Sequence, residues 1–163
     1  MSPLWRDEVG IYLAQRRACL VRLKRGIHPT LAAEIDHADA AAAPGWEGAL
    51  TLLEQQMNEG TWSNARVRVV LADQWVRYSV VPWTDALSSN AERLAHAREL
   101  MSGTFGAEMS DWTVSLSESP PGSPRLASAL LQALRDSALR HRQKLVSVQP
   151  QLIAAYNTWR HVL

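Results

Sequence analysis

The hydrophobic positions of this 163-residue chain recur with two periods, one typical of strands and one typical of helices. Alternation with period two predicts a hairpin from residues 9–13 and 18–24, joined by polar residues 15–17, and a short third strand over 30–35. Four more segments have a strand-like pattern: 67–72, 75–81, 112–117 and 144–148. Four have helical spacing: 46–59, 88–101, 126–142 and 151–163. This order predicts an α/β fold, with a mixed β-sheet and flanking helices.

Some of these segments have features that predict their packing. In 126–142, Leu130 and Leu134 belong to an apolar stripe that we expect to face the sheet. Ser88 or Ser89, followed by Glu92, predicts a capping box at the start of the helix over 88–101. The expected stripe of the helix over 46–59 consists of Trp46, Leu50, Leu53 and Met57.

Composition narrows the classes of function. Hydrophobic residues make up 47% of the chain and the net charge is only +1, so a packed domain is expected and nucleic acid is a poor candidate partner. The single cysteine, Cys19, cannot form an internal disulfide. The sequence has neither a signal-peptide core nor a stretch of ~20 apolar residues, which predicts a cytoplasmic protein without a direct membrane span.

The sequence contains no recognisable catalytic, cofactor-binding or metal-binding motif. Its histidines are scattered, and Asp36-His37-Ala38-Asp39 has the composition of a solvated loop. No Walker, dinucleotide-binding or nucleophile-elbow sequence is present. We therefore expect a protein that is not an enzyme and that holds neither a cofactor nor a metal.

Two parts of the chain resemble a known family. The run Val67 to Trp83, with two strand-like stretches and a Val-Pro ending, resembles a segment of actin-like assembly proteins: PilM of type IV pili, MshI-type pilus proteins and the cytoplasmic part of GspL in type II secretion. The helix, strand and helix predicted over 126–163 resemble the close of that family's first lobe. The resemblance implies that 1–163 forms a single actin-like, ribonuclease H-like lobe. The pattern is also compatible with a small subdomain over 36–125 that is inserted in this lobe or packed on it.

The resemblance implies a function as well. It suggests a non-enzymatic scaffold or adaptor of a bacterial pilus or secretion assembly platform, recruited to the inner membrane by a membrane-anchored partner. Actin-like ATPases open with an Asp-Ile-Gly-type phosphate loop, but this chain has Tyr12 in place of the Asp and Ala14 in place of the Gly. The alternatives are a nucleotide-binding actin-like domain with phosphoryl-transfer activity and an unrelated regulatory module that binds proteins.

Candidate partner-binding residues come from the unusual number of tryptophans. Trp75, Arg77 and Trp83 form the densest aromatic and arginine group, and Trp159 lies in the last predicted helix. We expect these residues to contact other proteins, including a second copy of the chain.

Two clusters of basic residues are compatible with a solvated surface, an acidic partner segment or anionic lipid headgroups. The first cluster is Arg16, Arg17, Arg22, Lys24 and Arg25, and the second is Arg135, Arg140, Arg142 and Lys144.

Overall fold

The computed structural model describes residues 6–39, 43, 45–58, 60–78, 81–82, 86–106, 112–114 and 125–159. The chain divides into two compact units, one formed by residues 1–74 and 130–163 and the other by residues 75–129. Residues 36–74, which the sequence analysis included in the range of a small subdomain, lie in the first unit. None of the helices within the described residues has the length and apolar character needed to cross a membrane.

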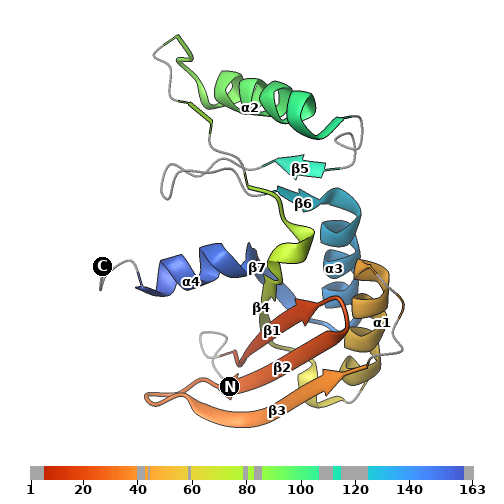
Figure 1. Cartoon of the computed structure of the whole chain (residues 1–163). Coiled ribbons are helices and arrows are strands. Elements are labelled where there is room, and N and C mark those ends of the chain that lie inside the picture. Colours follow the sequence, from red (N-terminus) through yellow and green to blue (C-terminus); the bar gives the residue numbers. More distant parts are fainter. Residues whose placement is uncertain are drawn as a thin grey trace. The chain divides into compact units, whose positions relative to one another are not determined.

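The first unit is built on a five-stranded mixed sheet with the order β3-β2-β1-β4-β7 (Figure 1). β1 pairs antiparallel with β2 and parallel with β4, β2 pairs antiparallel with β3, and β4 pairs parallel with β7. The α/β class and the mixed sheet predicted from the sequence are therefore confirmed. The strands are β1 (Glu8–Ala14), β2 (Arg17–Lys24), β3 (Thr30–Ala38), β4 (Arg66–Leu71) and β7 (Lys144–Pro150).

Two helices cover one face of this sheet. The connections that lead from β1 to β4 and from β4 to β7 contain α1 (Trp46–Met57) and α3 (Ser128–Arg140). Connections between parallel strands are right-handed, so two steps in the same direction place both helices on the same face. A third helix, α4 (Gln151–Trp159), follows β7 directly and lies on the opposite side of the sheet (Figure 1).

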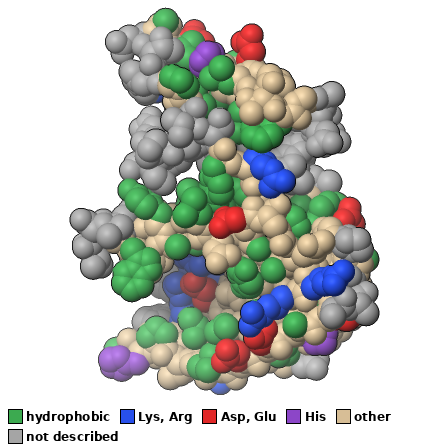
Figure 2. All heavy atoms as spheres, in the orientation of Figure 1, with side chains coloured by type: hydrophobic (Ala, Val, Ile, Leu, Met, Phe, Trp, Pro, Cys, Tyr) green, Lys and Arg blue, Asp and Glu red, His purple; other side chains and the backbone are tan. Residues whose placement is uncertain are grey.

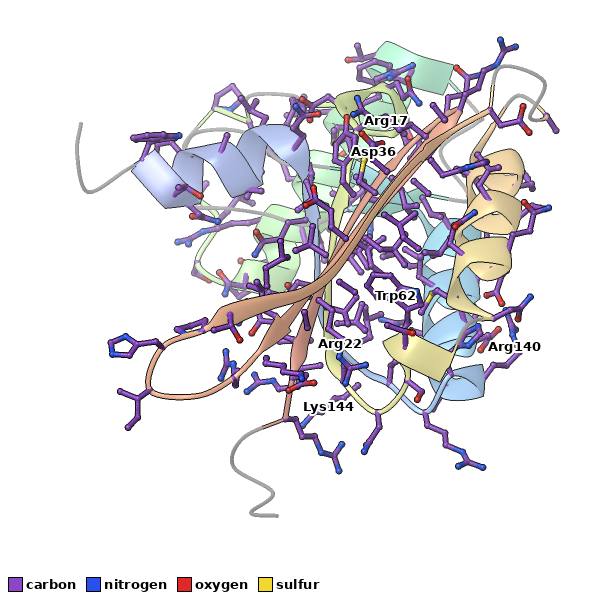
Figure 3. The ribbon with its side chains drawn as sticks, turned by 90° about the horizontal axis from the view of Figure 1, so that it is seen from below. Arg17, Arg22, Asp36, Trp62, Arg140 and Lys144 are labelled. Atoms are coloured by element: carbon purple, nitrogen blue, oxygen red, sulfur yellow. The ribbon has the colours of Figure 1, made fainter. Side chains whose placement is uncertain are left out.

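The core of the first unit lies between the sheet and the pair α1 and α3. Trp62, in the short 3₁₀ helix η2 (Gly60–Trp62), is its largest fully buried side chain, and Figure 3 shows it between the sheet and the helices. The backbone carbonyl of Trp62 accepts a hydrogen bond of 2.7 Å from Gln143 Nε2. Leu130 and Leu134 are buried, which confirms the predicted stripe of α3.

The second unit contains α2 (Asn90–Phe105) and an antiparallel pair of short strands, β5 (Trp112–Val114) and β6 (Arg125–Ala127). The predicted capping box is present, because Ser89 Oγ accepts the Glu92 N–H at 3.2 Å and Glu92 Oε2 accepts the Ser89 N–H at 3.1 Å. The small core consists of Ala97, Met101 and Val114, with Val81 and Leu94 packed against them.

The strand predicted over 75–81 is wrong in its described part. Trp75 ends a 3₁₀ helix, η3 (Asp73–Trp75), and Arg77 makes only an isolated bridge. A second strand following β4 could not pair with it as a hairpin, because β4 is already hydrogen-bonded to β1 on one side and to β7 on the other. Residues 79–80 lie outside the described part of the chain.

Three smaller differences concern boundaries and helix phase. β3 continues to Ala38, because its residues pair with β2 as far as Arg17, where a loop was predicted from residue 36. Leu126 lies in β6 and not in the helix. In α1 the buried side is centred on Ala49, Leu52 and Leu53, so the predicted stripe is rotated and Trp46 and Leu50 are only half-buried.

The packing of α3 can be tested with two leucines of the same helix. Leu134 is 3% exposed and Leu139 is 73% exposed. We expect Leu134→Ala to lower the free energy of unfolding by about 2–5 kcal/mol, since it leaves a cavity under the sheet. Leu139→Ala should change it by less than about 0.5 kcal/mol. Urea denaturation measures both, and equal losses in the two variants would contradict this packing.

Candidate functional site

The carboxyl ends of the three parallel strands β1, β4 and β7 meet at one edge of the sheet, called here the carboxyl edge. In open α/β sheets this is the edge at which ligands bind. Tyr12 lies near the end of β1, Asp73 follows β4, and Gln151 begins α4 directly after β7. The Tyr12 and Ala14 positions, at which the sequence departs from an actin-like phosphate loop, therefore lie at the expected edge.

The polar groups of the carboxyl edge bind one another. The Tyr12 hydroxyl donates to Gln151 Oε1 at 3.1 Å. Asp73 Oδ1 accepts the backbone N–H of Leu152 at 3.2 Å, which satisfies a free donor in the first turn of α4. A phosphate at this helix terminus would compete with the Asp73 carboxylate and be repelled by it. The turn between β1 and β2 consists of Gln15 and Arg16 alone.

Trp159 lies on an exposed stripe of α4. Leu152, Tyr156 and Trp159 have the spacing of a single helix face. Leu152 is 51% and Trp159 60% exposed, whereas Ile153 and Tyr156 are half-buried. We call Leu152, Tyr156 and Trp159 the α4 stripe. Figure 2 shows hydrophobic side chains gathered on the surface over this helix.

The other predicted partner-binding residues belong to the second unit. Trp75 is half-buried, and Arg77 is exposed with its guanidinium donating to the carbonyl of Val76 at 3.1 Å. Trp83 lies outside the described residues. Trp159 belongs to the first unit.

The amino ends of the parallel strands form the opposite edge of the sheet, called here the basic edge. The two basic clusters of the sequence contribute to it together, because β2 ends where β1, β4 and β7 begin. Glu8 is opposite both Leu23 and Arg66, and Arg66 is opposite Lys144. Arg22 and Lys144 lie at this end in Figure 3, whereas Arg17 and Asp36 lie at the other. The two clusters are far apart in the sequence, and only the strand order brings them together.

Two carboxylates organise the guanidinium groups of the basic edge. Asp7 binds Arg22 at 2.7 Å, and Arg22 also donates to the backbone carbonyl of Thr61. Glu8 binds Arg25 and Arg68, each at 2.6 Å. Partial burial acts to raise the pKa of Glu8, but the hydrogen bonds and charges of both arginines outweigh it and hold the pKa below its ordinary value.

Cys19 lies on the face of the sheet that is opposite α1 and α3, near the carboxyl edge. Its Sγ donates to Asp36 Oδ1 at 3.0 Å, and Arg17 Nε donates to the same oxygen at 2.8 Å. Burial and the Asp36 carboxylate raise the pKa of the Cys19 thiol, which disfavours the nucleophilic thiolate. Within the described part of the chain, no group of three or more His, Cys, Asp or Glu side chains is arranged to hold a metal ion.

Comparisons with solved structures show an actin-like fold. The cytoplasmic domain of EpsL, an inner membrane component of the type II secretion system of Vibrio cholerae, matches at TM-score 0.58 and 16% identity, over 88% of this chain and 57% of that one. A Bacteroides thetaiotaomicron protein with an actin-like ATPase fold and unknown function matches at 0.60 and 10%, over 96% and 56%. A chain of the PilM–PilN type IV pilus biogenesis complex matches at 0.57 and 15%, over 95% and 50%.

These matches show the actin-like fold that the sequence resemblance implied, and this chain spans about half the length of each of the three. No protein-family model matches the sequence, and no curated protein matches it.

The ion pairs of Glu8 predict a dependence of stability on pH. Because its pKa is lower in the folded state than the ordinary 4.5, the stabilisation is complete well above pH 4.5 and is lost as the pH falls through the folded-state pKa. We expect the free energy of unfolding to fall between about pH 5 and pH 3, and to fall less in Glu8→Gln. Glu34→Gln, at an exposed position of β3, is the control and should retain the wild-type slope. Identical slopes in wild type and Glu8→Gln would contradict the prediction.

Proposed function

We propose that this chain is a non-enzymatic scaffold or adaptor in the assembly platform of a bacterial type IV pilus or type II secretion system. The observation that carries the proposal is the likeness of its fold to the cytoplasmic domain of EpsL and to the PilM–PilN complex. By analogy with them, it acts at the cytoplasmic side of the inner membrane and binds a membrane-anchored protein.

The carboxyl edge supports the non-enzymatic part of this proposal. A phosphate-binding loop needs backbone N–H groups that are free to approach the ligand closely. Here Leu152 N–H already donates to Asp73, and the Tyr12 side chain lies across the edge to reach Gln151. These contacts use the polar groups of the carboxyl edge within the protein, and they therefore disfavour a nucleotide site there.

The α4 stripe supports the adaptor part. Trp and Tyr dominate the binding energy of many protein interfaces, because they combine a large apolar area with a polar group. Trp159 and Leu152 expose such area together, one helix turn on either side of Tyr156. This stripe is the first candidate contact for the partner, and the group of Trp75, Arg77 and Trp83 is the second.

A second candidate function is nucleotide binding. It is favoured by the similarity to a protein with an actin-like ATPase fold. The two functions differ in what they require of the carboxyl edge, so one binding measurement separates them.

For the nucleotide, we expect no binding of Mg-ATP at millimolar concentration. A ligand at about a hundred times its dissociation constant would stabilise the folded state by about 2.7 kcal/mol and raise the melting temperature. Differential scanning fluorimetry of the wild type with and without Mg-ATP should therefore give the same curve. A clear upward shift, larger in Asp73→Ala because the repelling carboxylate is gone, would favour the second candidate.

For the partner, we expect the chain to bind the cytoplasmic segment of a membrane-anchored pilus or secretion protein encoded beside its own gene. Trp159→Ala should weaken this binding by about 30-fold or more, the effect typical of a central interface residue. Isothermal titration calorimetry with the synthetic segments measures it. Leu139→Ala, which removes an exposed apolar side chain from α3, is the matched control and should bind as the wild type does.

Absence of binding to every such segment would contradict the adaptor function. Binding that neither Trp159→Ala nor the pair Trp75→Ala and Trp83→Ala weakens would place the interface elsewhere on the chain.

A further inference from the structure

The basic edge concentrates positive charge in a chain that is nearly neutral overall. Nearly half of the 17 lysines and arginines are at or beside this edge, against the two carboxylates of Asp7 and Glu8. Such segregation creates a local potential that the net charge of +1 does not reveal. The basic residues are Arg6, Arg22, Lys24, Arg25, Arg66, Arg68, Arg142 and Lys144.

Much of this charge is not neutralised within the described part of the chain. Arg22, Arg25 and Arg68 share the two carboxylates. Within the described residues, no ion pair involves Lys24, Arg66 or Lys144. Arg66 and Lys144, which have the same charge, are directly opposite each other on the neighbouring strands β4 and β7. Placing like charges opposite each other costs stability, so the arrangement suits an anionic surface outside the protein.

Exposed aliphatic side chains lie beside these cations. Leu23 and Leu31 are opposite each other near the end of the hairpin of β2 and β3, and Leu23 is also opposite Glu8 on the same face of the sheet. Ile27, in the connection between the two strands, is 88% exposed, and Leu31 is 59% exposed. The end of this hairpin therefore combines apolar side chains that contact water with a row of positive charges.

We propose that the basic edge and the tip of the β2–β3 hairpin form a docking surface for an anionic lipid bilayer. Lysine and arginine near such a surface are attracted to its headgroups, and aliphatic side chains gain free energy by entering the boundary between headgroups and acyl chains. An acidic peptide or a nucleic acid would use the charges alone, whereas the bilayer also accounts for the exposure of Ile27 and Leu31.

This surface is distinct from the one assigned to a protein partner. It involves the amino ends of the strands and the hairpin tip, and it does not include the α4 stripe. The proposal therefore does not rest on the adaptor function, and either can fail without the other.

The test is flotation of the full chain with lipid vesicles. One set of vesicles contains phosphatidylcholine alone and the other contains about 30% phosphatidylglycerol, enough to give a negative surface potential. We expect binding only to the anionic set, with an affinity that falls steeply as salt shortens the Debye length to about 3 Å at 1 M. Lys24→Gln, Arg66→Gln and Lys144→Gln combined should weaken it by roughly 100-fold, since each cation near the surface contributes about fivefold.

A charge-matched control separates the surface from the overall charge. Arg16→Gln, Arg135→Gln and Arg98→Gln combined remove the same charge from exposed positions that are not part of the basic edge, the first two in the first unit and Arg98 in the second, and this variant should lose little affinity. Ile27→Ser should weaken binding to anionic vesicles by roughly tenfold. None of the substituted cations forms an ion pair within the described residues, and Ile27 is exposed, so melting temperatures should be no lower than the wild-type value.

Three outcomes would overturn the proposal. The first is no binding to anionic vesicles at low salt, and the second is equal weakening by the two triple variants. The third combines two results: Ile27→Ser binds anionic vesicles as tightly as the wild type, and polyglutamate or duplex DNA fully displaces the protein from them. Together these results would make the basic edge a general polyanion site.

Discussion

Burial of one face of the sheet under α1 and α3 is the interaction on which the rest of the first unit depends. Val9, Ile11 and Leu13 of β1 alternate inward with almost no exposure. The same alternation in β4 buries Val67 and Val69, so the two central strands share one apolar face. Both covering helices lie on that face because right-handed crossovers leave no other arrangement for β1, β4 and β7. The opposite face, on whose side α4 lies, has polar and charged residues such as Glu8 and Arg68.

The parallel strands then give the two edges of the sheet different chemistry. At the carboxyl edge, Asp73 and Tyr12 use their hydrogen-bonding groups on α4. At the basic edge, Glu8 and Asp7 bind three arginines and leave other cations in contact with water. The same strand order therefore places the Asp73 carboxylate at one edge and an excess of positive charge at the other.

Features encoded locally could be predicted from the sequence. The first hairpin, the buried side of α3 and the Ser89–Glu92 capping box each depend on residues close together in the chain. The error over 75–81 could not be seen from local residues. A strand-like pattern forms a strand only where a sheet edge is free, and β4 is flanked by β1 and β7. The basic edge was missed for a related reason, since residues near 24, 66 and 144 meet only through the parallel register.

The last helix, α4, has nine residues, and it combines a first turn bound by Asp73 with an exposed apolar stripe. An isolated helix of this length is marginal in water, so α4 must be held by the rest of the unit. Asp73 binds the backbone at its first turn, and Ile153 and Tyr156 are half-buried. Trp159 lies two turns further on, where fixing the start of the helix also fixes the direction of its exposed stripe. Under the proposed adaptor function, an aromatic side chain held in this way would lose less conformational entropy on entering an interface than one on a mobile segment.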